Sequence, residues 1–353
     1  MPTRHAPCLC APRLARIGVV LLSAALASCA GPADPQYFSG PTMGTTYHVT
    51  LTRLPRQVSR EQVQAVVDEV LDDVDRRFST WRNDSELARF NTLRGTQWVP
   101  VSDDLLAVVT EAQRVAAASH GAFDVTVAPL VDVWGFGRDG SRTTTAPDAR
   151  ALHDARDDVG YALLEVQDAP PALRKHRPGL RLDVSGIAPG FAVDRIAARL
   201  QRLQVRDAMV ELGGEVRAWG RNPDGMPWRV AVEAPLSGER RVYAVVPLDG
   251  QSVSTSGDYR DFRIVAGRRI SHTVDPRSGR PVEHGLASVT VVDASAMTAD
   301  AYATALMVLG PEEGWRFAAE HQIAAMLLER VPGAPGWRER VTPQFARLRP
   351  PGS

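Results

Sequence analysis

Asp300 and Thr304 are the two residues whose types and spacing most directly suggest chemistry. They lie four apart in a segment, 296–309, whose pattern predicts a helix, so they share one helix face. A carboxylate and a hydroxyl at that spacing offer hard oxygen ligands, which suit Mg²⁺ better than a softer metal. The alanines around them are small and would let another backbone approach closely. In the alternative interpretation, Asp300 is a charge on the helix surface and Thr304 has no role.

His272 is a candidate proton acceptor. It stands between Ser271 and Thr273 in a segment, 270–276, that is predicted to be a strand ending in a turn. An imidazole beside a phosphate group could take the proton of an attacking hydroxyl. A single histidine in a strand is more often structural, so the sequence leaves both roles open.

Asp183 stands where a predicted strand, 181–184, meets a glycine-bearing turn and then a helix that begins at Pro189. The first N–H groups of such a helix are free, and together with the helix dipole they favour an anion such as phosphate. The alternative is an ordinary strand–turn–helix connection with a solvated aspartate, because the glycine spacing at Gly186 and Gly190 is weak evidence by itself.

The hydrophobic pattern predicts the elements that must position these side chains. Helices are expected over 59–74, 103–119 and 296–309, besides the one from Pro189. Strands are expected over 42–50, 120–126, 208–219, 228–234, 241–247, 287–292 and 323–328, with Gly213 and Gly214 inside one of them. Loops are expected over 129–137 and 252–259, and a variable surface insertion over 138–159. The fold class is therefore α+β, with antiparallel strands and helices packed around them.

Composition excludes one class of partner. The chain has 353 residues, of which 44% are hydrophobic, enough for one large domain or two closely packed ones. Its formal net charge is zero, whereas proteins that bind the phosphate backbone of nucleic acid normally carry a basic excess. We therefore expect no nucleic-acid partner.

The N-terminus is predicted to be an export signal. Basic residues precede a short apolar run, 17–26, which is too short to span a bilayer, and small residues then lead to Cys29. This pattern resembles a bacterial lipoprotein signal, so we expect a signal peptide over 1–28, lipid on Cys29, a tether over 29–36, a folded domain over 37–331 and a loose tail over 332–353. A plain signal with a chance cysteine is the alternative. Cys8 and Cys10 would be removed, which leaves no thiol for a disulfide, a nucleophile or a metal site.

Eight segments together resemble the ApbE-type FAD:protein FMN transferases. In chain order they are T-M-G-T-T-Y (42–47), W-R-N-D-S-E-L-A-R-F-N (81–91), G-A-F-D-V-T-V-A-P-L-V (121–131), L-D-V-S-G-I-A-P-G-F-A-V-D (182–194), E-L-G-G-E-V (211–216), T-S-G-D-Y-R (255–260), S-H-T-V-D-P-R-S-G-R-P-V (271–282) and A-M-T-A-D-A-Y-A-T-A-L (296–306). They cover nearly the whole chain after the predicted signal and tether.

The resemblance implies a two-lobed fold with the site between the lobes, and a reaction. FAD would lie across a pocket, Mg²⁺ would grip its pyrophosphate, and the FMN half would pass to a threonine or serine hydroxyl of an acceptor protein while AMP leaves. The acceptor would be a flavin-carrying subunit of a membrane redox pump. The metal would be held by Asp300, Thr304 and the backbone carbonyl near Gly186, and His272 would be the general base. The residues expected to contact FAD are Met43, Trp81, Ala122, Phe123, Asp124, Asp183, Pro189 and Val274.

Two residues depart from the family's common pattern. Pro189 stands where many members carry lysine, which removes an ammonium that would contact phosphate or ribose. Trp81 replaces a common tyrosine, which keeps a ring but moves its polar group. Both changes are expected to alter FAD affinity rather than the chemistry.

Two other functions are compatible with these residues. A hydrolase would use the same site but let water attack, splitting FAD into FMN and AMP. A flavin-binding lipoprotein without catalysis would act as a cofactor store, although such a store needs no base. In all three cases we expect the protein to face the periplasm, anchored by lipid to the inner membrane in preference to the outer.

Overall fold

The structure is a computed structural model of the chain, and it describes residues 34–137, 146–236, 238, 240–258, 262–265, 268–331, 333 and 336–349. The predicted signal segment, Cys29 and most of the predicted tether lie outside these ranges. Residues 33–353 fall in one compact unit. Of the helices that the structure describes, none has both the length and the apolar character needed to cross a membrane.

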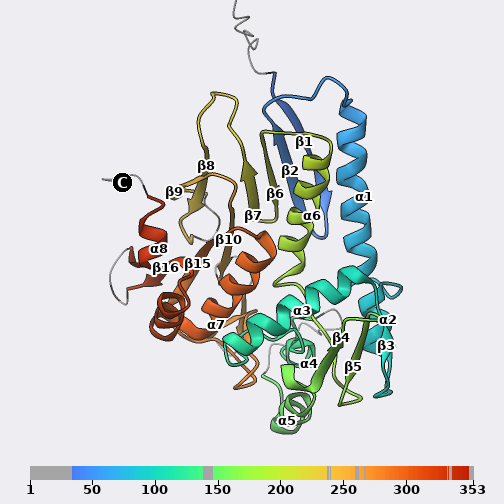
Figure 1. Ribbon diagram of the computed structural model, residues 1–353. Helices are drawn as coiled ribbons and strands as arrows, with labels where there is room; N and C mark the ends of the chain where they lie inside the picture. The colour runs from blue at the N-terminus through green and yellow to red at the C-terminus, as the bar shows by residue number, and fades with distance from the viewer. Residues whose placement is uncertain are drawn as a thin grey trace, which may run out of the picture. The chain divides into compact units, whose positions relative to one another are not determined.

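One antiparallel sheet of eight strands forms the centre of the fold. Its strand order is β1-β2-β6-β7-β10-β15-β16-β17 (Figure 1). Its strands are β1 (Gln36–Thr42), β2 (Thr45–Leu51), β6 (Ala208–Leu212), β7 (Glu215–Trp219), β10 (Ser252–Gly257), β15 (Leu286–Asp293), β16 (Ala324–Arg330) and β17 (Trp337–Val341). The hairpin turn between β6 and β7 consists of Gly213 and Gly214, whose φ angles of 67° and 120° suit glycine. The sequence had predicted one strand through this turn.

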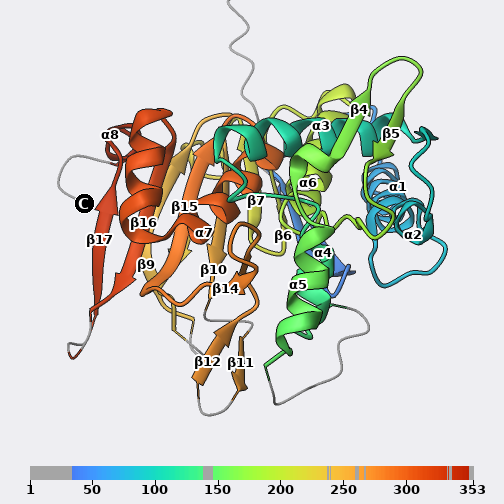
Figure 2. The same cartoon turned by 90° about the horizontal axis from the view of Figure 1, so that it is seen from below.

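Helices cover one face of the sheet, where α6 packs on β6 and β7 and α7 packs on β10 and β15 (Figures 1 and 2). The long helices are α1 (Arg60–Phe78), α3 (Asp103–Ala118), α6 (Ala188–Arg202) and α7 (Ala296–Glu320). Their apolar faces and those of β2, β6 and β15 form one hydrophobic cluster. All four helices were predicted from periodicity. The predicted end of the last one, Leu309, coincides with a kink at Gly310 (φ 81°) before Pro311, after which α7 continues.

The first long helix shows why the sequence prediction of helices succeeds. Ser59 accepts a hydrogen bond from the backbone N–H of Gln62 (3.2 Å), and the Gln62 side chain accepts one from the N–H of Ser59 (2.8 Å). This reciprocal pair is the predicted capping box. Such signals are local, so they can be recognised without knowing the rest of the fold.

The opposite face of the sheet carries a second, smaller hydrophobic cluster. It contains inward-facing residues of β7, β10 and β16, the hairpin of β8 (Trp228–Glu233) and β9 (Val242–Leu248), and Phe345 of α8 (Pro343–Ala346). The β8–β9 hairpin was predicted. The α+β class is thus as expected, and the two hydrophobic clusters lie on the two faces of one continuous sheet.

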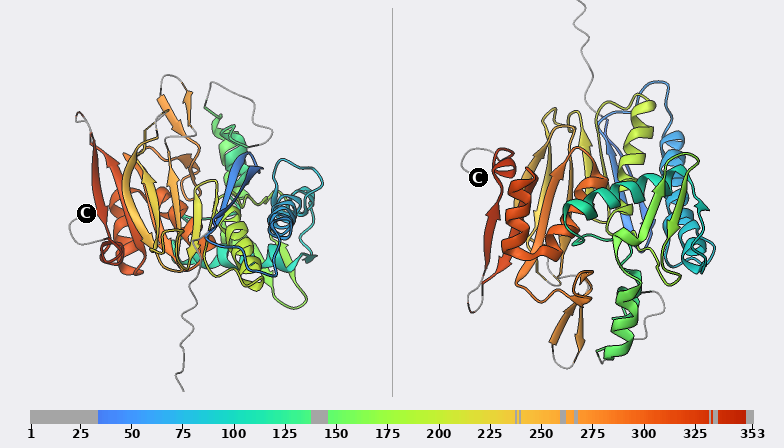
Figure 3. Two further views of the ribbon diagram at one scale, coloured as in Figure 1. Left: turned by 90° about the horizontal axis from the view of Figure 1, so that it is seen from above. Right: turned by 60° about the horizontal axis from the view of Figure 1, so that its bottom comes forward.

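The remaining elements are short and lie around the ends of the sheet. The β11–β12 hairpin and α5 project in the same direction (Figure 3). These elements are α2 (Glu86–Thr92), α4 (Ala128–Val133), α5 (Ala149–Asp157), a 3₁₀ turn (Tyr161–Leu163), the sheet of β3 (Val99–Pro100), β5 (Ala172–Lys175) and β4 (Leu164–Gln167), and the hairpins β11 (Phe262–Val265) with β12 (Arg268–Ser271) and β13 (Val274–Asp275) with β14 (Arg280–Pro281).

Several predicted segments have a different structure. The segment 120–126 is a turn and not a strand, and 181–184 makes only an isolated bridge between Arg181 and Val127. The expected loop over 252–259 contains strand β10, which pairs with both β7 and β15, and the expected loop over 129–137 contains most of α4. Part of the predicted insertion, 138–145, lies outside the described residues, and α5 occupies most of the rest.

The C-terminal segment was predicted to be loose, and over residues 337–349 this prediction is wrong. Strand β17 pairs with β16 from Arg330↔Trp337 to Met326↔Val341. Thr342 and Phe345 are fully buried, and the Thr342 hydroxyl donates to the carbonyl of Ile323 (2.8 Å). The many prolines and arginines suggested a loose tail, but the strand is held by a partner that lies elsewhere in the sequence.

Candidate active site

The twelve residues predicted to bind FAD or metal, or to act as base, all line one cavity of about 960 Å³. They are Met43, Trp81, Ala122, Phe123, Asp124, Asp183, Gly186, Pro189, His272, Val274, Asp300 and Thr304. The cavity is of the size that proteins use for large organic ligands. The fold therefore brings together segments separated by more than two hundred residues.

Asp300 lies on the first half of α7, at the closest approach between α6 and α7. It is buried, and one of its carboxylate oxygens (Oδ2) accepts a hydrogen bond from the backbone N–H of Gly190 on α6 (3.1 Å). A Cβ atom at Gly190 would lie 2.3 Å from the carbonyl oxygen of Ala296, so only glycine allows the two helices to come this close. The alanines on either side of Asp300, at 299, 301, 303 and 305, are all fully buried.

A second buried carboxylate, Glu215 on β7, acts on Asp300. Burial, together with the negative charge of Glu215, raises the pKa of Asp300 well above its usual value. The Ser254 hydroxyl on β10 donates a hydrogen bond to Glu215 (3.2 Å). Two buried carboxylates repel each other unless a cation or a proton lies between them. This pair is therefore a candidate cation-binding site.

Oxygen groups beside this pair fit Mg²⁺. The Thr304 hydroxyl lies 3.4 Å from that of Ser256, and a Cβ built on Gly186 would lie 3.0 Å from the Thr304 hydroxyl, so the Gly186 backbone is next to it. Within the part of the chain that the structure describes, no three His, Cys, Asp or Glu side chains form a metal-binding group. Mg²⁺ is commonly held by one or two carboxylates and completed by substrate phosphates, so the donors present fit this ion.

The turn from Asp183 to Pro189 lines the same cavity. The Asp183 carboxylate accepts from the N–H of Ser185 (2.9 Å) and so shapes the turn. Helix α6 begins at Ala188 after Ile187, which provides no side-chain cap, and Pro189 occupies the second helical position. The predicted helix start is therefore confirmed to within one residue. Its first N–H groups are not free as expected, because Ala188 donates to Val184, Gly190 to Asp300 and Phe191 to Ile187, and Pro189 has no N–H.

Asp124 and Phe123 form part of the cavity wall and are both buried. The Asp124 carboxylate accepts hydrogen bonds from the backbone N–H (2.8 Å) and the hydroxyl (2.7 Å) of Thr126. Burial raises the pKa of Asp124 to about 6, although these hydrogen bonds oppose the change. The wall thus contains a carboxyl group that changes charge close to neutral pH.

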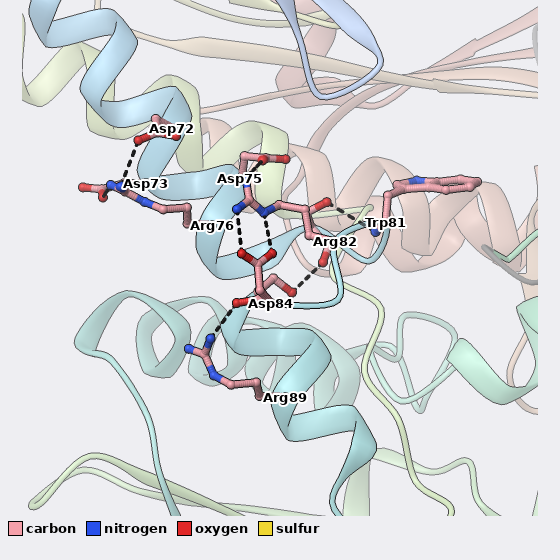
Figure 4. A network of polar contacts seen from close by, with 10 residues as sticks. Asp72, Asp73, Asp75, Arg76, Trp81, Arg82, Asp84 and Arg89 are labelled. Carbon is pink, nitrogen blue, oxygen red and sulfur yellow. Dashed lines mark hydrogen bonds and ion pairs between the residues drawn. The ribbon is translucent and has the colours of Figure 1, made fainter.

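Trp81 lies at the edge of the cavity with 68% of its surface exposed, so its ring is available for stacking. Its loop is held by ion pairs, and the indole extends away from them (Figure 4). Arg82 binds the Asp84 carboxylate with two hydrogen bonds of 2.9 Å and also reaches Asp75 at the end of α1 (3.1 Å). Arg82 holds the pKa of Asp84 below its usual value. The exposed ring is therefore carried by a loop that is itself fixed.

His272 is half-buried and lies between β12 and β13, not within a strand as predicted. The next residue, Thr273, donates its backbone N–H to the Ser271 hydroxyl (3.1 Å), which shapes the bend. The imidazole lines the same cavity as Asp300 and Thr304. This place is compatible with the predicted role in proton transfer, which stays a prediction.

Comparison with known proteins identifies the family. The profile of the ApbE family matches residues 43–327. The chain belongs to the ApbE family. A Vibrio cholerae protein named FAD:protein FMN transferase is 40% identical over 320 residues, covering 91% of this chain and 94% of its own length. A Klebsiella pneumoniae protein of the same name is 38% identical over 339 residues, covering 94% and 96%.

Solved ApbE structures share the fold. The flavin transferase ApbE from Vibrio cholerae superposes with a TM-score of 0.82 at 39% identity, covering 90% of this chain and 100% of that one. The apo form of the Pseudomonas stutzeri flavinyl transferase ApbE gives a TM-score of 0.82 at 42% identity, covering 90% and 97%. The resemblance seen in the sequence is thus confirmed, and with it the α+β ApbE fold.

Sequence reasoning missed two polar residues of this ApbE cavity that lie beside the candidate metal ligands. Glu215 was part of a matching segment, E-L-G-G-E-V, but no role was given to it. Ser256 was placed in a loop, whereas it belongs to β10 and lies against Thr304. A signal was present for Glu215, because a carboxylate directly after a Gly-Gly turn is placed at the end of a hairpin, beside the cavity.

Proposed function

We propose that this chain transfers the FMN half of FAD to a threonine or serine hydroxyl of an acceptor protein and releases AMP. The observation that carries this proposal is the meeting of the buried Asp300–Glu215 pair with Thr304 and His272 in one cavity. Phosphoryl transfer depends on positioning and on neutralising charge more than on covalent help from the enzyme. Membership of the ApbE family supports the same reaction.

The bonds exchanged define what the residues must do. The acceptor oxygen forms a bond to the phosphorus of the FMN half, and the bond from that phosphorus to the oxygen shared with AMP breaks, with its electron pair leaving on AMP. His272 accepts the proton of the acceptor hydroxyl. Asp300, Thr304 and the Gly186 carbonyl, with Glu215 beside them, would hold Mg²⁺, which would supply charge neutralisation at the pyrophosphate.

Other groups bind and orient FAD. The Trp81 ring stacks on an aromatic part of the dinucleotide. Pro189 contributes neither an ammonium nor an N–H, so binding of the phosphates would depend on the metal to a greater extent. We infer that Pro189→Lys tightens FAD binding, and unchanged or weaker binding would contradict this reading.

The cellular location of the reaction is also a proposal. We propose that lipid on Cys29 anchors the protein to the periplasmic side of the inner membrane, and that the acceptor is a flavin-carrying subunit of a membrane redox pump. The apolar run followed by small residues and Cys29 supports the anchor. Labelled palmitate should enter the wild-type protein and not Cys29→Ala. Equal labelling of both would contradict the anchor.

The deciding experiment mixes the mature protein with FAD, Mg²⁺ and a threonine-bearing acceptor. Flavin fluorescence that stays with the acceptor on a denaturing gel, with an equal amount of AMP, supports the transferase. AMP and free FMN without labelled acceptor would instead indicate the hydrolase, and FAD binding without either product would indicate a cofactor store.

The role of His272 has its own test. His272→Ala should bind FAD normally but transfer FMN at least about a hundredfold more slowly, in the range expected for loss of a general base. His153→Ala, which changes an exposed histidine of α5, is the matched control. A transfer rate unchanged by His272→Ala would remove it as the base.

A further inference from the structure

The cavity continues past the candidate active site along strand β8. Five consecutive β8 residues, 229–233, line it, whereas none of its described lining belongs to β9. The same cavity is also lined by Thr46 and His48 of β2 and Met209 and Glu211 of β6. We call this part of the cavity the β8 groove, defined by residues 229–233 and these four side chains.

The β8 groove lies on the face of the sheet opposite to α6 and α7. Met209 packs against the second hydrophobic cluster, whereas its strand neighbour Val210 belongs to the cluster under the helices. Side chains alternate across a strand, so Met209 and Glu211 point to the same side, away from α6. The turns at Met43–Gly44 and Gly213–Gly214 line the cavity as well, so they stand where the β8 groove meets the site.

One edge of β8 has no strand partner among the described residues. β8 pairs only with β9, and Arg229 lies opposite Pro247, which has no N–H. Ala234 donates its N–H to the carbonyl of Arg241 (2.7 Å), so the even-numbered residues of β8 are those bonded to β9. Arg229 and Ala231 therefore direct their N–H and C=O groups away from β9, toward the groove.

The groups along this edge are open and polar. Arg229 and Ala231 are exposed, and the Arg229 guanidinium makes no ion pair or hydrogen bond with any residue that the structure describes. The Nδ1 atom of His48 lies 2.7 Å from the Glu211 carboxylate, which also accepts the N–H of Gly214 (3.0 Å). Of the four side chains from β2 and β6, Met209 is apolar, whereas His48 and Glu211 form a polar pair held in place by this contact.

An unpaired strand edge recruits extended chains, and natural proteins usually cover or block such an edge. Among the described residues the edge of β8 is left open, and it lies along the cavity that a protein substrate must enter. A hydroxyl of a folded acceptor can reach the FMN phosphate only if the chain around it enters the same cavity as His272 and Asp300. Main-chain hydrogen bonds would hold that chain irrespective of most of its side chains.

We propose that the β8 groove binds the acceptor protein through an extended segment that adds as a strand to the free edge of β8. This inference rests on the proposed function, because it assumes a protein acceptor. The segment's backbone bonds to Arg229 and Ala231, and its threonine is thereby delivered past the Gly213–Gly214 turn to the active site.

Two proline variants test this proposal, at residues that lie opposite each other in the β8–β9 hairpin. Ala231→Pro removes the N–H that faces the groove, and Val245→Pro removes the N–H of its cross-strand partner, which faces the other edge. Proline is tolerated on strand edges where the N–H points outward, so both variants should fold. Ala231→Pro should raise KM for the acceptor about tenfold, because a main-chain bond is lost and the ring obstructs the added strand. Val245→Pro should leave KM unchanged.

The kinetic pattern separates docking from general damage. FAD affinity, thermal unfolding temperature and kcat at saturating acceptor should be the same in both variants as in the wild type. Equal effects of the two substitutions on KM for the acceptor, or no effect of Ala231→Pro, would overturn the proposal.

A second measurement does not depend on transfer. Hydrogen exchange is followed in the wild type with and without the flavin-carrying subunit, whose acceptor threonine is replaced by alanine. Protection of the Arg229 and Ala231 amides supports the proposal. Binding that leaves these amides unprotected, or protection that appears without the acceptor at high enzyme concentration and so indicates a second copy of this chain, would overturn it. If the wild type binds in this way but labels no acceptor, the proposed function fails while the docking surface stands.

Discussion

At the scale of single residues, the buried carboxyl group of Asp124 links stability to pH. Its pKa in the folded protein is about 6, above the ordinary aspartate value, because burial disfavours the charged form. A raised carboxyl pKa stabilises the fold below the ordinary pKa, and this stabilisation is lost as the pH rises through 6. From this group alone, the free energy of unfolding should fall by about 2 kcal/mol between pH 4 and pH 7.5.

Asp124→Asn should remove that pH dependence. The amide oxygen can still accept the hydrogen bonds of Thr126, but it does not titrate. Urea unfolding of both proteins at pH 4 and pH 7.5 measures the difference. Identical changes with pH in the variant and the wild type would show that Asp124 is charged throughout.

Asp300 is expected to make the stability of the fold depend on Mg²⁺. Without a cation, its charge is costly in the fold because Glu215 lies close, so Asp300→Asn should be at least as stable as the wild type at pH 8. Mg²⁺ at a hundred times its dissociation constant should stabilise the wild type by about 2.7 kcal/mol and leave the variant unchanged. Thermal unfolding with Mg²⁺ or with chelator measures this. Glu320→Gln, an exposed carboxylate on the same helix, is the control, and a variant that still responds to Mg²⁺ would contradict the metal assignment.

At the scale of elements, the loop between α1 and α2 determines where the Trp81 ring lies. Arg82 closes this loop onto Asp84 and Asp75 (Figure 4). Arg82→Gln should let the ring move in the free protein, so that ordering it opposes FAD binding and KM for FAD rises roughly fivefold while kcat changes little. Arg76→Gln is the control, because within the described part of the chain Arg76 pairs only with Asp72 and Asp73 on α1. A fall in kcat with unchanged KM would mean that the loop acts on the chemistry.

The elements also show which parts of a fold a sequence can predict. Helices α1, α3, α6 and α7 were predicted because the caps and apolar stripes that specify them lie within each segment. Strand β10 was missed because its small polar residues resemble a loop, and it is a strand only through β7 and β15 on either side. Whether a segment forms a strand depends more on its neighbours in the sheet than on its own residues. Such errors are therefore expected for central strands.

At the scale of the whole molecule, the cavity could be predicted only in part. Family resemblance supplied its residues, and composition or periodicity would not have shown that Trp81, Asp183 and His272 meet. The partnership of Glu215 with Asp300 depends on how β7 faces α7, which no spacing in the sequence reveals. The free edge of β8 likewise follows from the absence of a second neighbouring strand among the described residues, which is a property of the assembled fold.

The C-terminal segment provides a test at this scale. It belongs to the sheet, but it has no assigned role in the candidate active site. Phe345 is fully buried in the second hydrophobic cluster, beneath β16. Phe345→Ala should lower the free energy of unfolding by about 3–5 kcal/mol, the range for removing a buried aromatic ring, whereas Arg347→Ala, an exposed change in the same segment, should lower it by less than about 0.5 kcal/mol. FAD affinity should be unchanged in both, because neither residue lines the cavity. Denaturant unfolding and FAD titration below the unfolding midpoint measure the two properties separately. If Phe345→Ala weakened FAD binding while the protein stayed folded, the second cluster would be shaping the cavity through β8, and the segment could not be treated as purely structural.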